Sequence, residues 1–126
     1  MLALYIMSVK KTVMSTEMKF PEFDISAKIK FLSGAEGGRT TPAFSSYRPN
    51  HNFGLKEGLV DAVHEYVGTN KAQPGTQVYT HMVFLTPRLL LGKLTLGQEF
   101  RVQEGDKLIA LGRISKIFRD ELRSYS

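Results

Sequence analysis

Three histidines are the side chains of this chain best suited to metal binding or to acid–base chemistry. His51, His64 and His81 lie on three separate segments, without the short spacing that is typical of zinc ligands. We therefore interpret them as surface or half-buried strand residues. The chain has no cysteine and no G-x-S-x-G sequence, so it lacks a thiolate and a nucleophile elbow. The sequence predicts no catalytic residue, no metal site and no enzyme activity.

Nucleotide hydrolysis would need a phosphate loop, G-x-x-x-x-G-K-[ST], in which backbone amides cradle phosphates and a hydroxyl holds magnesium. The nearest match contains Gly92 and Lys93, but Pro87 stands at the first glycine and Leu94 at the hydroxyl position. The Asn-Lys pair that begins at Asn70 also lacks the aspartate of a guanine-binding N-K-x-D motif. No nucleotide and no other cofactor is predicted.

The stretch EGGRTTPAFSSYRPN, residues 36–50, has a composition that specifies backbone shape more than reactivity. Gly37 and Gly38 permit backbone angles that other residues avoid, while Pro42 and Pro49 fix the chain and remove hydrogen-bond donors. The stretch cannot be a helix and must flank strands. Because it contains no nucleophile beside a base, it is better suited to a contact surface than to a reaction centre.

The composition of the chain fits one globular domain with a basic surface. It has 126 residues, with 17 Lys and Arg against 12 Asp and Glu, which gives a net charge of +5. An excess of positive charge favours polyanionic partners, but the basic residues are scattered along the sequence. Lys28 and Lys30 alternate on one expected strand, and others thicken the C-terminal end. The absence of cysteine agrees with a cytoplasmic protein.

The two ends of the chain differ from its middle. Residues 1–19 are expected to be a loosely ordered leader, residues 20–119 a β-barrel domain and residues 120–126 a short tail. The apolar run 2–9 is shorter than the roughly 20 residues needed to cross a membrane. It also lacks the charge order of a secretory signal. No membrane partner is predicted, and the alternative for the leader is an amphipathic anchor or partner helix.

Most of the chain has strand periodicity. Residues 23–32 alternate apolar and polar side chains, which indicates a strand with one buried face. Further strands are expected at 48–55, 59–67 and 77–86, although 59–67 also fits a short helix. Glu104-Gly105-Asp106 is typical of a hairpin loop between the last two strands. Short strands with Gly and Pro between them favour an all-β barrel or sandwich.

These motifs, taken in order, resemble the third, C-terminal domain of bacterial elongation factor Tu. The resemblance covers about residues 20–118 and implies a six-stranded antiparallel β-barrel, here as a stand-alone protein. It rests on the following stretches: Glu36-Gly37-Gly38-Arg39, Thr41-Pro42, Phe44, Tyr47-Arg48-Pro49, Pro74-Gly75, Thr86-Pro87 and GQEFRVQEGDKLIALGRISKI.

The resemblance also implies two contact surfaces on opposite sides of the barrel. One faces the GTPase domain in the full factor, and here it would be a protein interface made by Glu36, Gly37, Gly38 and Arg39. The other meets the T stem of aminoacyl-tRNA. Its expected RNA-binding residues are Asn50, Glu104 and Gly105, with Arg101 and Lys107 as basic neighbours that hold phosphates.

Three functions remain open at the level of sequence. The leading expectation is a non-enzymatic binding module, related to translation factors, that binds tRNA, other RNA or the translation apparatus. The alternative is a protein-interaction module that imitates the third domain and binds a GTPase domain, an exchange factor or a toxin. The last is a truncated remnant with a stable fold and no selected role.

Overall fold

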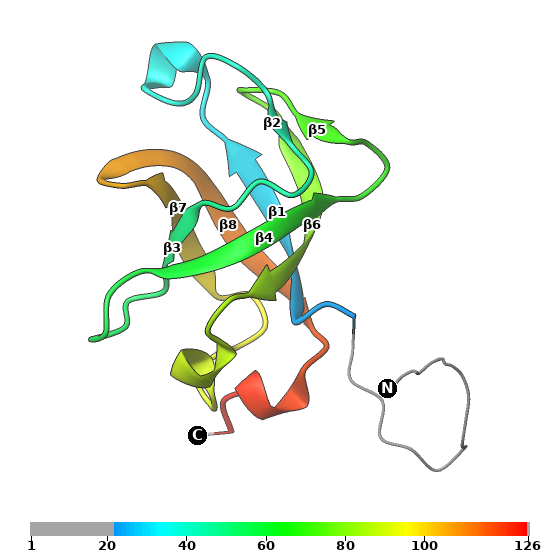
Figure 1. Cartoon of the computed structure of the whole chain (residues 1–126), viewed down its shortest axis with the longest axis vertical. Coiled ribbons are helices and arrows are strands. Elements are labelled where there is room, and N and C mark those ends of the chain that lie inside the picture. The colour runs from blue at the N-terminus through cyan, green and yellow to red at the C-terminus, as the bar shows by residue number, and fades with distance from the viewer. Residues whose placement is uncertain (1–21, 126) are drawn as a thin grey trace.

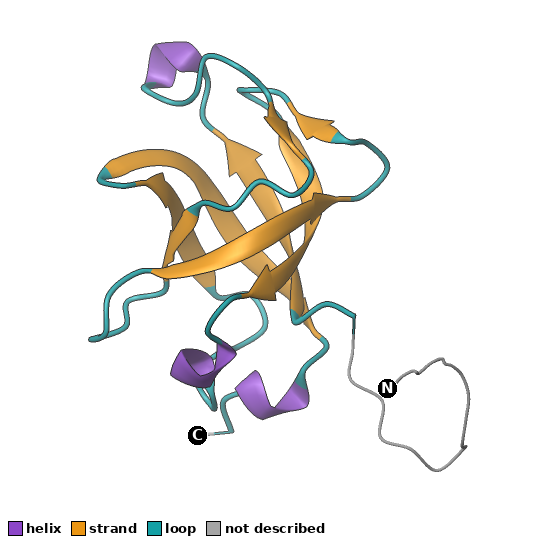
Figure 2. Ribbon diagram, in the orientation of Figure 1, coloured by secondary structure: helices purple, strands orange, loops and turns teal. Residues whose placement is uncertain are grey.

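The computed structural model describes residues 22–125, and these form a closed six-stranded β-barrel (Figures 1 and 2). The strands follow one another around the barrel in the order β1-β6-β4-β3-β7-β8, and every neighbouring pair is antiparallel. The barrel strands are β1 (Ile25–Phe31), β3 (Asn50–Asn52), β4 (Val60–Tyr66), β6 (Gln77–Phe84), β7 (Glu99–Glu104) and β8 (Lys107–Ile117). The predicted fold class is therefore confirmed.

Short elements lie at the two ends of the barrel (Figure 1). A two-stranded sheet of β2 (Ala43–Phe44) and β5 (Lys71–Ala72) shares one end with the 3-10 turn η1 (Gly34–Glu36). The 3-10 turns η2 (Pro87–Leu90) and η3 (Asp120–Leu122) lie at the other end.

Strand β1 shows how the sequence pattern becomes the barrel wall. Its apolar residues, from Ile25 to Phe31 at every second position, are buried, whereas Lys28 and Lys30 are exposed. It pairs with β6 on one side and with β8 on the other, so it has no free edge. Closure of the sheet removes the edges that would otherwise pair with other chains.

The interior is filled so tightly that one strand position requires glycine. Phe100 on β7 lies opposite Gly112 on β8, and a Cβ at Gly112 would lie 2.2 Å from the Phe100 ring. The glycine therefore makes room for the phenyl ring inside the barrel.

Residues 59–67 contain a strand, β4, and not a helix, as expected. The strand expected at 48–55 is shorter, because β3 spans only Asn50–Asn52. Pro49 precedes it, and Gly54 follows with φ of 79°, which ends the extended conformation. The expected hairpin is confirmed: Glu104 and Lys107 pair across the turn that joins β7 to β8.

The segment predicted as a short tail is held against the barrel. Leu122 in η3 is fully buried, and Arg123 bridges to Leu94. Just before it, the Arg119 side chain donates to the buried carboxylate of Asp24 at 2.5 Å. The predicted leader, residues 1–19, lies outside the described residues.

Candidate nucleic-acid interface

The β7–β8 hairpin is joined to β3 through the side chain of Asn50. The Asn50 Oδ1 atom accepts the backbone N–H of Gly105 at 3.2 Å, and its Nδ2 donates to Asp61 Oδ1 at 2.6 Å. The Gln103 side chain donates to the carbonyl of Gly105 at 2.9 Å. Gly105 has φ of 61°, a left-handed angle that suits glycine in a tight turn. The sequence placed Asn50 and Gly105 in one site, and the structure brings them into direct contact.

Glu104 lies beside this turn and binds Arg39 and Tyr47. Its carboxylate accepts a hydrogen bond from the Arg39 guanidinium and another from the Tyr47 hydroxyl. The Arg39 guanidinium also lies over the Tyr47 ring, 4.9 Å from its centre, and donates to the carbonyl of Pro42 at 3.1 Å. Arg39 thereby ties the 36–50 loop to the hairpin.

This contact shifts the acidity of both partners of Arg39. Partial burial alone would raise the pKa of Glu104, but the hydrogen bonds from Tyr47 and Arg39 outweigh it, and the pKa is lowered. Burial, and then the hydrogen bond to the Glu104 carboxylate, raise the pKa of the Tyr47 phenol. Glu104 is therefore a carboxylate and Tyr47 a neutral donor at neutral pH.

The contact between Arg39 and Glu104 also corrects an expectation. The resemblance implied that the protein interface and the RNA-binding residues lie on opposite sides of the barrel. The structure instead joins Arg39 of the first set to Glu104 of the second by an ion pair. The two predicted surfaces meet at one end of the barrel, because the 36–50 loop folds back onto the hairpin.

The other predicted interface residues shape the loop that presents Arg39. Glu36 closes a capping box with Ser33, which satisfies the backbone N–H groups at the start of η1. Gly37 follows with φ of 92°, and Gly38 is buried, with room for no Cβ because Leu32 O would be 2.4 Å away. Glu36 and Gly37 are exposed, whereas Gly38 has a structural role.

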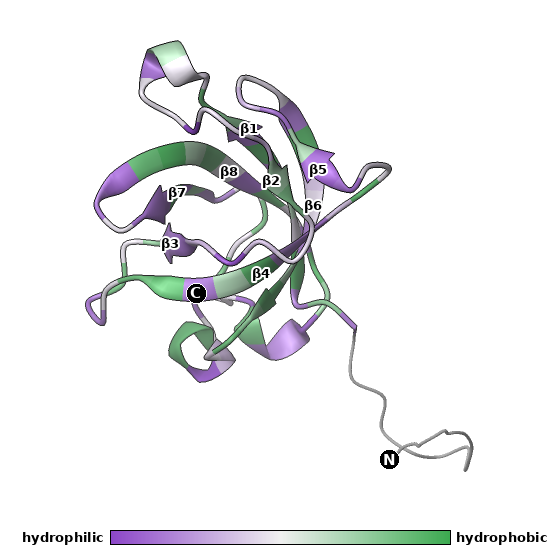
Figure 3. Ribbon diagram, turned by 45° about the horizontal axis from the view of Figure 1, so that its top comes forward, coloured by the Kyte–Doolittle hydropathy of each residue, from purple (hydrophilic) through white to green (hydrophobic). Residues whose placement is uncertain are grey.

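The two predicted phosphate-holding residues are exposed near the hairpin. Lys107 pairs with Glu104 at the turn, and its charge contributes to the lowered pKa of that carboxyl. Arg101 lies on β7 opposite Asn52 of β3, with its side chain exposed. The hairpin tip that bears Glu104 and Lys107 is hydrophilic (Figure 3). The hairpin end therefore combines a hydrogen-bonded backbone turn with exposed cations at its margin.

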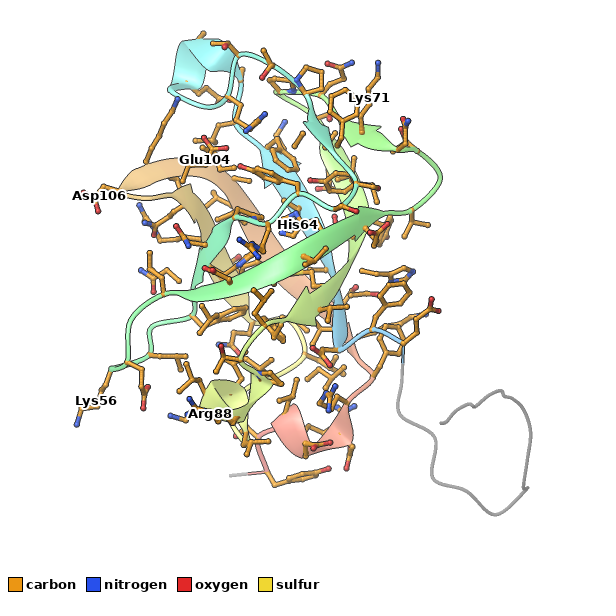
Figure 4. All side chains as sticks on the ribbon, viewed as in Figure 1. Lys56, His64, Lys71, Arg88, Glu104 and Asp106 are labelled. Carbon is orange, nitrogen blue, oxygen red and sulfur yellow. The ribbon has the colours of Figure 1, made fainter. Side chains whose placement is uncertain are left out.

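The histidines depart from the prediction of surface or half-buried residues. His51 and His64 are fully buried and face each other, with 2.8 Å between their Nε2 atoms (Figure 4 labels His64). His81 is half-buried, as expected. Every second residue of β4 is buried, at Val60, Ala62 and Tyr66, and His64 belongs to the same series. This alternation indicates that His64 is buried, and the sequence interpretation missed it.

One arrangement of protons satisfies the buried histidines without charge. His51 Nδ1 lies 3.1 Å from the carbonyl of Val60 and must donate to it, so His51 Nε2 accepts from His64 Nε2. His64 Nδ1 is then free to accept the hydroxyl of Tyr66 at 3.3 Å. Burial lowers the pKa of His51 to about 4 and that of His64 well below its usual value. The pair is a neutral part of the core.

No family model matches this chain. Its architecture is described by the closed antiparallel barrel alone. Within residues 22–125, no group of three or more His, Cys, Asp or Glu side chains is placed to hold a metal ion. No helix in that range is long and apolar enough to span a membrane.

Proposed function

We propose that this chain is a non-enzymatic binding module related to translation factors, and that it binds tRNA or similar RNA through its hairpin end. The observation that supports this most directly is the contact of Asn50 with Gly105 beside Glu104. Asn50 and Gly105 are 55 residues apart in sequence, yet they are hydrogen-bonded, with Arg101 and Lys107 exposed nearby. The order of motifs that resembles the third domain of elongation factor Tu is the second support.

The division of labour at this end follows from the contacts. Lys107 and Arg101 are exposed cations that bind phosphates and supply affinity. Gly105 has no side chain, so a sugar–phosphate backbone can approach the turn closely. The side-chain amide of Asn50 is already hydrogen-bonded to Gly105 and Asp61. Asn50 therefore positions the turn and does not contact the RNA bases directly. Recognition of this kind depends on shape and phosphate geometry more than on base sequence.

The test is a salt titration of tRNA binding with a matched pair of double variants. We expect Arg101→Gln/Lys107→Gln to weaken binding by roughly tenfold and to reduce the log–log salt slope by about 1 for each lost phosphate contact. The control is Lys56→Gln/Lys71→Gln, which removes the same charge from two exposed residues that lie away from Glu104 (Figure 4). If the two double variants bind tRNA equally, the hairpin end is not the RNA site.

A protein-interaction function is the second candidate, because an exposed aromatic ring accompanies the Arg39 loop. Phe44 on β2 is 56% exposed, in the same 36–50 segment as Glu36 and Gly37. An exposed phenyl ring beside polar residues is typical of a protein contact. We propose that this face would bind the GTPase domain of a translation factor. It could also receive an exchange factor or a toxin.

This second candidate is tested by direct titration with the isolated GTPase domain of elongation factor Tu. Phe44→Ser should abolish binding, while Leu91→Ser, at an exposed residue directly after η2 at the opposite end of the barrel, should leave it intact. Gly38 is unsuitable for this test, since any side chain there would displace the loop itself. Absence of binding by the unaltered protein would reject this candidate for that partner.

A further inference from the structure

The barrel assembles a row of cations that the sequence leaves scattered. Lys28 on β1 lies between Tyr79 on β6 and Arg113 on β8, in the pairing of the three strands. Paired residues on neighbouring strands point to the same side of the sheet, so these side chains share the outer surface. Lys28 and Lys30 are about 7 Å apart along the strand, since they are two residues apart. We call this surface the β1 groove.

The β1 groove is hollowed on both sides of Lys28. One hollow, of about 330 Å³, and another, of about 350 Å³, are both lined by this lysine. The lining of the first includes Lys28, Lys30, Arg113 and Glu99. The lining of the second includes Lys28, Ser26, Tyr79, His81 and Lys116. The linings include four cationic side chains of Lys and Arg and a single carboxylate, so the groove attracts anions.

The cations of the β1 groove are held by weak, exposed contacts. Arg113 pairs with Glu99, but their side chains are 59% and 69% exposed, so this ion pair contributes little to stability. Lys30 donates to the carbonyl of Gly75 at 2.8 Å in an exposed hydrogen bond. Lys28 lies 5.6 Å from the centre of the Tyr79 ring. A phosphate can replace such contacts at small cost.

The second hollow adds rings and hydroxyls to this charge. Tyr79 is 51% exposed, and Lys28 contacts its ring only by an exposed cation–π interaction, so the ring is accessible to a ligand. His81 is fixed beside it, because its Nδ1 lies 2.6 Å from Ser26 Oγ and its ring stacks on Phe23 at 4.4 Å. An open aromatic face next to cations is the arrangement on which unpaired bases stack while phosphates are neutralised.

We infer that the β1 groove is a second nucleic-acid site, which binds single-stranded RNA along β1. Phosphates lie on Lys28, Lys30 and Arg113, and one base stacks on Tyr79 in the second hollow. A duplex fits the same charges, but its bases are already stacked on each other and leave the tyrosine unused. The β1 groove does not depend on tRNA binding at the hairpin end, although Leu111 in its lining pairs with Arg101.

The test measures fluorescence anisotropy of a labelled twelve-nucleotide oligouridine on the full chain. Lys28→Gln/Lys30→Gln should weaken binding at least tenfold and reduce the salt slope by about 1.4, at about 0.7 for each phosphate on a single strand. Lys56→Gln/Lys71→Gln is the control of equal charge and should change affinity less than twofold. All four lysines are exposed, so folding should be unaffected, and the circular dichroism spectrum checks it.

The tyrosine separates single-strand recognition from general attraction between charges. Tyr79→Ala should weaken oligouridine binding about tenfold, and Tyr79→Phe should restore it, because stacking needs only the ring. Binding of a twelve-base-pair RNA duplex should not change with either substitution. The inference is overturned by absence of oligouridine binding at 50 mM salt, by equal loss in both lysine double variants, or by a Tyr79→Ala variant that binds like the unaltered protein.

The hairpin variants keep this outcome distinct from the first proposal. Lys107→Gln, which keeps Arg101 beside the groove, should weaken tRNA binding and leave oligouridine binding within about threefold of the unaltered protein. Suppose that the hairpin variant binds tRNA like the unaltered protein, whereas Lys28→Gln/Lys30→Gln loses oligouridine binding. This result would reject only the proposed function at the hairpin end. The reverse result would reject the β1 groove alone.

Discussion

At the residue scale, the fold depends on two buried histidines whose ring nitrogens are all hydrogen-bonded. His51 and His64 share a hydrogen bond inside the barrel, and each uses its other nitrogen on Val60 or Tyr66. Such a chain is stable only while both imidazoles are neutral, since burial strongly opposes a charge. The core is therefore sensitive to protonation.

The first prediction concerns acid pH. The pKa of His51 is about 4 in the fold and near 6.5 unfolded, so the unfolded chain binds the proton more readily. Stability is complete above pH 6.5 and falls as the pH drops toward 4. From His51 alone we expect a loss of about 2 kcal/mol between pH 7.5 and 5. Urea unfolding at the two pH values measures it.

The control for acid pH replaces the pair with apolar side chains. His51→Leu/His64→Leu should unfold with a free energy that is nearly equal at pH 7.5 and 5, whatever its absolute stability. The carboxylates with lowered pKa values, Glu36 and Glu104, add their own loss only as the pH falls below about 4.5. A double variant with the same pH dependence as the unaltered protein would contradict the role of the histidines.

The second prediction concerns Gly112. Its replacement by alanine brings a Cβ against the Phe100 ring, so the ring must move within a filled core. We expect Gly112→Ala to lower the free energy of unfolding by about 1–3 kcal/mol, as overpacking does. Gly34→Ala is the matched control, because its Cβ would lie 3.5 Å from Thr40, an ordinary contact. Equal urea midpoints for the two variants would contradict this account.

At the element scale, the 36–50 loop and the β7–β8 hairpin act as one unit. Arg39 links them by its ion pair with Glu104, and Tyr47 donates to the same carboxylate. The loop therefore depends on the hairpin for its position, although the two are more than fifty residues apart in sequence.

The third prediction measures this link with a double-mutant cycle. The cycle of Arg39→Ala and Glu104→Ala should give a coupling energy of roughly 1 kcal/mol, because the pair is only partly exposed and shares hydrogen bonds with Tyr47. The cycle of Arg113→Ala and Glu99→Ala, an ion pair that is mostly exposed, should give less than about 0.5 kcal/mol. Coupling energies in the opposite order would show that the loop is positioned by other contacts.

Strand elements were predictable from sequence where one face is apolar and the other polar. Residues 23–32 have this alternation and contain β1. Residues 59–67 also contain a strand, β4, but apolar Val63 lies on its outward side and apolar Val67 follows it, exposed, so the sequence fitted a short helix as well. The strand at 48–55 was overestimated, because its pattern continues through Gly54 although the backbone turns there. Partners in space were not predictable: the His51–His64 contact and the β1 groove depend on strand pairing between distant segments.

At the scale of the whole molecule, closure of the barrel decides which charges act together. The hairpin end and the β1 groove adjoin across β7 and β8, since Arg101 on β7 pairs with Leu111 on β8, which lines the groove. The structure brings Asn50 to Gly105 by a hydrogen bond, while the role of these residues and Glu104 in RNA binding stays a prediction. The sequence could not show that Arg39 binds Glu104, because this contact requires the loop to fold back over the barrel end.

The most direct test of RNA binding is a titration of purified protein with bulk tRNA between 50 and 200 mM salt, alongside the Arg101→Gln/Lys107→Gln variant. The account predicts micromolar or tighter binding at low salt, a steep fall with salt and a shallower slope for the variant. No binding of tRNA at 50 mM salt, or binding that this variant leaves unchanged, would contradict the proposed function at the hairpin end.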